Sequence, residues 1–146
     1  MSEQATGQRP WNPTVLVLAS FVLSPFGAGI VLAANDHRLG LKDRAPATFY
    51  VFFFVSLISY LVLANLHAER VLPLASREGW LFSRALVGWL ALSLAWLWSR
   101  PARRAHARVR STGVRNAQPL LPCVLAFGLS LTIDGFVWQS FFHPYG

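Results

Sequence analysis

The chain has 146 residues, of which 54% are hydrophobic and only 13% are charged, and its mean hydropathy is +0.43. This composition excludes an ordinary soluble domain and predicts an integral membrane protein. The formal charge of +7 does not indicate nucleic-acid binding, because the arginines lie in short segments beside apolar runs. The single cysteine, Cys123, excludes an intramolecular disulfide and with it the membrane thiol oxidases that need cysteine pairs.

Four apolar runs predict four transmembrane helices. Residues 1–14 read as a polar tail, and residues 15–146 as a transmembrane domain with spans at 15–34, 47–66, 80–99 and 120–142. A helix of twenty residues rises about 30 Å, which matches the hydrocarbon core of a bilayer. The first run is too long for the apolar part of a signal peptide, and the tail before it has no basic cluster. We therefore expect an all-α, up-down bundle of four helices.

The first predicted span carries small residues along one side. Gly27 and Gly29 are expected to let a neighbouring helix approach closely, and Pro25 is expected to bend the span near its middle. Trp11, just before the span, is expected to anchor it at the membrane interface.

Residues 25–40 resemble a pattern found in small, uncharacterised bacterial polytopic membrane proteins. The matching positions are Pro25, Ala28, Gly29, Asn35, Leu39 and Gly40. The resemblance covers about a tenth of the chain and implies a bacterial membrane protein, without implying an activity, a cofactor or a partner.

A stretch from residue 100 to 115 contains six arginines and no acid. These are Arg100, Arg103, Arg104, Arg108, Arg110 and Arg115. With Arg38, Lys42 and Arg44 they place nine basic residues after the first and third spans, whereas the tail and the middle loop hold three. Basic loops stay in the cytoplasm, so this bias predicts a protein of the bacterial inner membrane with both termini outside.

If the arginine stretch is helical, four of its side chains share a face. They are Arg100, Arg103, Arg104 and Arg108. The favoured interpretation is that this face binds anionic lipid headgroups, from which each arginine would gain about 1 kcal/mol. The alternative is that the same face binds an acidic protein partner.

Asp134 is the acid inside a predicted span, where insertion of a charge costs roughly 2.5 to 3.5 kcal/mol. Residues at a similar depth form a predicted intramembrane polar layer: Asp134, Arg84, Ser24, Ser59, Tyr60 and Trp89. Because side chains lean toward the N-terminus of their own helix, the simpler expectation is that Arg84 reaches outward to water, but a tilt of the helices would let it pair with Asp134. Asp134 is expected to face the interior of the bundle, within hydrogen-bond reach of another member of this layer. The layer either holds the helices together, which is favoured, or forms a proton or cation site in which Asp134 changes protonation state.

The sequence contains no phosphate-binding loop and no serine-nucleophile elbow, so we expect no enzymatic activity. His67 and His143 fall at the outer ends of their helices, and a haem or metal there is the weakest alternative; we expect no cofactor.

The favoured function is a non-catalytic accessory or scaffold subunit that acts through helix packing, in a homo-oligomer or a larger membrane complex. The alternative is a small oligomeric transporter or proton-coupled channel with Asp134 as the coupling residue.

Overall fold

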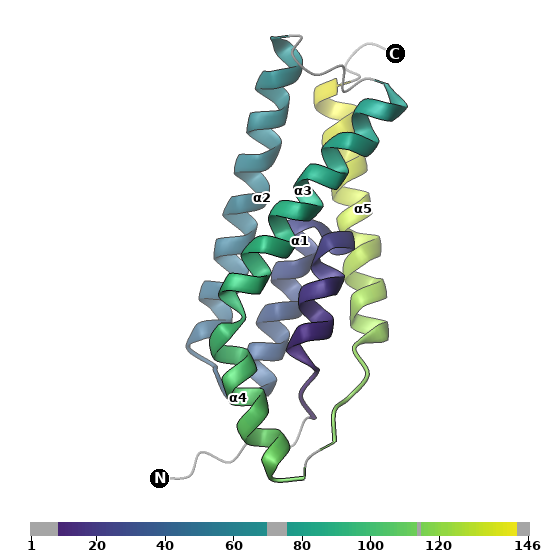
Figure 1. The fold of residues 1–146 in the computed structure, drawn as a ribbon. Coiled ribbons are helices and arrows are strands. Elements are labelled where there is room, and N and C mark those ends of the chain that lie inside the picture. The colour runs from purple at the N-terminus through teal and green to yellow at the C-terminus, as the bar shows by residue number, and fades with distance from the viewer. Residues whose placement is uncertain (1–8, 70–75, 114, 143–146) are drawn as a thin grey trace.

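The computed structural model describes residues 9–69, 76–113 and 115–142, and the regular secondary structure of this part of the chain is all α-helix (Figure 1). Its elements are α1 (Pro13–Arg38), α2 (Arg44–Ala68), α3 (Arg77–Trp98), α4 (Arg100–Ser111) and α5 (Leu120–Phe142). By length and composition α1, α2, α3 and α5 are each apolar enough to cross a membrane. The prediction of an all-helical chain with four such segments is confirmed.

α1 is a hairpin of two half-helices that meet at Ser24 (Figure 1). Ser24 has φ 58° and ψ 172°, and the following Pro25 has no N–H with which to continue the helical hydrogen bonds. The backbone N–H of Trp11 donates to the side-chain oxygen of Asn35 at 2.9 Å, although a straight helix would hold residues 24 positions apart at a distance of about 36 Å. Both ends of α1 therefore lie at the same end of the molecule.

This hairpin differs from the predicted course, in which residues 15–34 run once through the bundle. Residues 13–23 rise about 16 Å and residues 25–38 about 21 Å, so that neither half-helix matches a hydrocarbon core of about 30 Å. The proline was expected only to bend the span, whereas the positive φ of Ser24 reverses the chain. The prediction that both termini lie on one side assumed a single crossing by α1, which the structure does not have.

α1 forms the centre of the molecule, and α2, α3 and α5 surround it (Figure 1). Leu16 and Val17 of the first half-helix and Ala28 and Val31 of the second are at most 1% exposed, and they belong to one core with the buried Phe52 of α2. The hairpin therefore provides the apolar core on which the other helices pack.

Gly27 and Gly29 lie on the second half-helix and face different neighbours. A Cβ at Gly29 would lie 2.7 Å from Cβ of Phe52 in α2, and a Cβ at Gly27 would lie 3.1 Å from the carbonyl oxygen of Ala126 in α5. Both positions allow a close approach that a larger residue would prevent.

Trp11 is only 4% exposed and packs in the core, in contrast to its predicted place at the membrane interface. The hairpin explains the difference, because it returns residues 34–38 to the start of α1. The guanidinium of Arg38 lies over the Trp11 ring, 4.1 Å from its centroid, and Arg38 Nη1 donates to the carbonyl of Arg9 at 3.1 Å.

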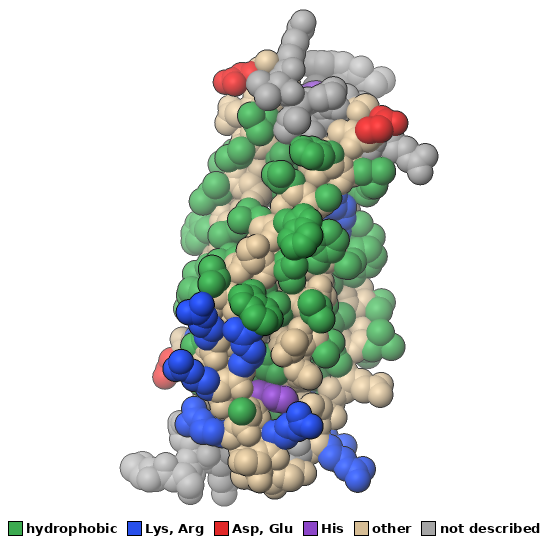
Figure 2. Space-filling model, in the orientation of Figure 1, with side chains coloured by type: hydrophobic (Ala, Val, Ile, Leu, Met, Phe, Trp, Pro, Cys, Tyr) green, Lys and Arg blue, Asp and Glu red, His purple; other side chains and the backbone are tan. Residues whose placement is uncertain are grey.

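Lys and Arg side chains gather at the end of the molecule where α4 lies, and apolar side chains cover its middle (Figure 2). We call this the basic end. The basic end contains the described residues Arg9, Arg38, Lys42, Arg44, Arg100, Arg103, Arg104, Arg108, Arg110 and Arg115. We call the opposite end, where α2 ends and α3 begins, the far end. α4 is amphipathic, because Ala102, Ala105 and His106 face inward while most of its arginines are exposed.

Candidate functional site

The break in α1 leaves backbone carbonyls at the tip of the hairpin without their usual helical partners. Pro25 lacks the N–H that the carbonyl of Phe21 would accept, and the turn at Ser24 separates the carbonyls of Val22 and Leu23 from the second half-helix. A buried carbonyl without a hydrogen-bond partner lowers the stability of the fold by about 1 to 3 kcal/mol. We therefore expect the surrounding helices to supply hydrogen-bond donors to these carbonyls.

α3 and α5 supply these donors. Arg84 of α3 donates from Nη2 to the carbonyl of Val22 at 3.1 Å, and Ser130 of α5 donates from its hydroxyl to the carbonyl of Leu23 at 2.7 Å. α3 also comes very close to the tip at Gly88, where a Cβ would lie 2.5 Å from the carbonyl oxygen of Phe21. The tip is thus held on two sides.

Ser24 also bonds to α5 through its side chain. Its hydroxyl oxygen lies 2.5 Å from that of Ser130, and the two residues are 3% and 0% exposed. The predicted polar layer contained Ser24 but not Ser130. Ser130 lies one helical turn before Asp134 on the same face of α5, and this spacing is a signal in the sequence that could have identified it.

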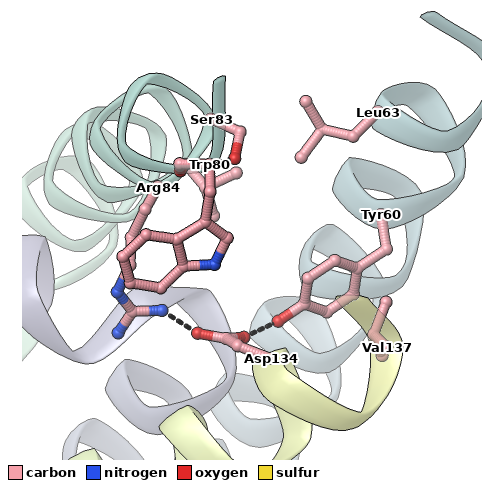
Figure 3. A pocket seen from close by; sticks show the side chains of 8 residues that line it. Tyr60, Leu63, Trp80, Ser83, Arg84, Asp134 and Val137 are labelled. Carbon is pink, nitrogen blue, oxygen red and sulfur yellow. Dashed lines mark hydrogen bonds and ion pairs between the residues drawn. The ribbon is translucent and has the colours of Figure 1, made fainter. Parts of the chain in front are cut away.

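Asp134 joins three helices (Figure 3). Its carboxylate forms an ion pair with Arg84 of α3, and the hydroxyl of Tyr60 of α2 donates to its other oxygen. Asp134 is 9% exposed and the Arg84 side chain 20%. The structure therefore brings together the acid, the cation and the tyrosine of the predicted layer, next to the hairpin tip.

Of the two expectations for Arg84, the structure has the pair with Asp134 and not the simpler one, in which Arg84 reaches outward to water. Two features account for the difference. α3 runs obliquely across the bundle (Figure 1), so its side chains do not point directly toward the far end. The Val22 carbonyl at the hairpin tip is a second acceptor that a continuous α1 would not offer.

Two other members of the predicted layer do not take part in this cluster. Trp89 is 61% exposed and contacts Phe21 edge-on, with the ring centroids 5.5 Å apart. It follows Arg84 by five positions, which turns it about 140° away around the helix. Ser59 is 9% exposed and donates to the carbonyl of Val55 in its own helix at 2.7 Å.

A cavity of about 40 Å³ adjoins the Arg84–Asp134 pair (Figure 3). Its lining comes from α2, α3 and α5: Tyr60, Leu63, Trp80, Ser83, Arg84, Val87, Asp134 and Val137. This volume holds roughly three water molecules and is far below the several hundred Å³ of a typical small-molecule site. The ion pair is therefore placed beside a space for water rather than beside a ligand pocket.

A second buried polar cluster lies at the basic end and was missed in the sequence. Asp36, at the end of α1, pairs with Arg44 of α2 at 3.3 Å and accepts from the hydroxyl of Thr48 at 2.6 Å. The indole N–H of Trp98 in α3 donates to Thr48 at 2.8 Å, and Arg44 donates to the Trp98 carbonyl. The cluster joins α1, α2 and α3. An acid shortly after an apolar run was its only sequence signal.

The four arginines predicted to face lipid headgroups do not all point the same way. Arg100, Arg104 and Arg108 are exposed on α4. Arg103 instead folds back on α3, where it donates to the carbonyl of Trp96 at 3.1 Å and lies 4.2 Å from the centroid of its ring.

The described residues contain no group of three His, Cys, Asp or Glu side chains that would hold a metal ion. His67 lies in the last turn of α2, and His143 lies outside the described residues. His106 of α4 bonds to the side chain of Asn116 at 2.8 Å.

Comparison with protein-family models, with curated proteins and with solved structures finds no match. The function therefore has to be inferred from the hairpin tip, the ion pair and the distribution of charge.

Proposed function

We propose that this protein is a non-catalytic scaffold or accessory protein of a bacterial inner membrane. In this proposal α2, α3 and α5 cross the membrane, while α1 enters it and returns to the same side. Irregular backbone at membrane depth is tolerated where protein buries it, and the carbonyls at the hairpin tip are enclosed by α3 and α5.

The distribution of basic residues supports a cytoplasmic basic end. Arg9 joins the nine basic residues that follow the apolar runs 15–34 and 80–99, because the hairpin brings the start of α1 to this end. Cytoplasmic segments carry such an excess. The proposed topology has the N-terminus in the cytoplasm and the end of α5 outside, which replaces the expectation of two external termini.

The observation that carries the scaffold role is the contact of Arg84 and Asp134 with three helices and the hairpin tip. Buried polar groups hold helices together in a membrane, where apolar burial gives no driving force between them. Both charged groups already have partners, and the cavity beside them has room for little besides water. The apolar outer faces of α2, α3 and α5 would contact lipid, further copies of the chain or a larger complex.

One observation favours the second candidate, a proton-coupled transporter. Asp134 lines a cavity with room for water, which is the setting of a residue that exchanges a proton. Against this role, the half-helices below the tip are closely packed, with Leu16, Val17 and Val31 at most 1% exposed.

Reconstitution into liposomes containing a pH-sensitive dye distinguishes the two roles. Asp134→Asn keeps the shape and a hydrogen bond but removes the charge. A scaffold should give no proton flux above that of protein-free liposomes under an imposed gradient, and the Asn variant should remain folded and assemble like the wild type. Flux in the wild type that Asp134→Asn abolishes, with folding intact, would establish transport and overturn the scaffold proposal.

A further inference from the structure

A groove of about 360 Å³ lies on the surface of the basic end, between α2, α3 and α4. Its lining combines three arginines with apolar side chains: Arg44, Leu97, Trp98, Arg100, Pro101 and Arg104. The groove shares no residue with the cluster at the hairpin tip, so the role of that cluster does not account for the charge of the groove.

The positive charge in this groove exceeds what the protein neutralises. Arg44 is fixed on one wall by Asp36 and by the Trp98 carbonyl. Arg100 and Arg104 are exposed, one helical turn apart, and neither side chain has an ion pair or hydrogen bond among the residues that the structure describes. Three guanidinium groups against one carboxylate leave a net charge that suits a phosphate group.

Apolar surface continues directly from the charged part of the groove. Leu97 is 57% exposed, and the half-buried Trp98 ring lies 5.2 Å from the guanidinium of Arg44. A free phosphate would use only the arginines, whereas an anion attached to an acyl chain would use both parts. Basic pockets between helices on the cytoplasmic side of membrane proteins bind anionic headgroups in this way.

We propose that the groove binds one anionic phospholipid of the cytoplasmic leaflet, with its phosphate between Arg44, Arg100 and Arg104 and an acyl chain along Leu97. The choice of leaflet rests on the proposed topology. The proposal differs from a general attraction of lipid to the arginine face, because it requires one site with a definite set of side chains.

The test is a titration of the purified full-length protein in neutral detergent with phosphatidylglycerol, with bound lipids counted by native mass spectrometry. The double variant Arg100→Gln, Arg104→Gln removes two charges from the groove. The matched control, Arg108→Gln with Arg110→Gln, removes two exposed charges from the same helix outside it. At about 1 kcal/mol for each arginine, affinity for the first lipid should fall about 30-fold in the groove variant.

The control should retain the wild-type affinity within about threefold, and phosphatidylcholine should not occupy the site. An equal loss in both double variants would show diffuse attraction, and no loss in either would remove the site; both results overturn the proposal. Displacement of the lipid by millimolar inorganic phosphate would overturn the lipid as the ligand. None of these results depends on whether the protein is a scaffold or a transporter.

Discussion

The ion pair of Arg84 and Asp134 allows a quantitative test by a double-mutant cycle. Removing one partner of a buried ion pair leaves the other charge unpaired and costs about 3 to 5 kcal/mol. Because the Arg84 side chain is 20% exposed, we expect the lower part of this range, about 3 kcal/mol, for Asp134→Leu. Arg84→Leu also removes the bond to the Val22 carbonyl, so its cost should be about 4 kcal/mol.

The variant with both leucines should be more stable than either single variant. No unpaired charge remains in it, and the remaining losses are the bonds to the Val22 carbonyl and from the Tyr60 hydroxyl, together about 2 kcal/mol. Reversible unfolding in mixed detergent and SDS micelles measures each free energy. As a control, Ser59→Ala combined with Arg84→Leu should give additive losses, since the two residues share no partner. Additive losses in the Arg84 and Asp134 cycle would refute the ion pair.

Two further predictions concern backbone conformation and close approach. Ser24→Gly should be more stable than Ser24→Ala by about 1 to 3 kcal/mol, because glycine tolerates φ 58° and ψ 172° without strain; in a continuous helix the order would be reversed, with alanine favoured by about 1 kcal/mol. Gly88→Ala should lower stability by about 1 to 3 kcal/mol, because its Cβ would meet the Phe21 carbonyl, whereas Gly128→Ala, with nothing within 4 Å, should not. Both comparisons use the same unfolding assay. Equal stability of Gly88→Ala and Gly128→Ala would contradict the close packing of α3 on the hairpin tip.

The sequence predicts the helices and part of the candidate site because both depend on local patterns. The run at 120–142 is α5, and those at 47–66 and 80–99 coincide closely with α2 and α3. The cost of a buried charge was enough to predict that Asp134 needs a partner, and depth along each helix brought Tyr60 and Arg84 into consideration.

The hairpin could not be predicted in the same way, because its length and hydropathy are those of a crossing helix. The decisive feature is the positive φ of Ser24, and serine has no preference that would indicate it. Ser130 and Asp36 were missed for a related reason. Their partners become neighbours only after the chain reverses and the second half-helix lies beside α2 and α5.

The reversal of α1 is tested most directly by cross-linking of cysteine pairs with a short bifunctional thiol reagent in native membranes, with Cys123→Ser as background. Arg9→Cys with Arg38→Cys joins the two ends of the hairpin, where the Arg38 side chain contacts the Arg9 carbonyl at 3.1 Å. A straight helix would hold these positions about 43 Å apart. Arg9→Cys with Glu69→Cys, at the far end of α2, is the matched control. Cross-linking of the first pair and not of the second is the expected result; cross-linking of residues 9 and 69 without residues 9 and 38 would mean that α1 crosses once and that the hairpin is wrong.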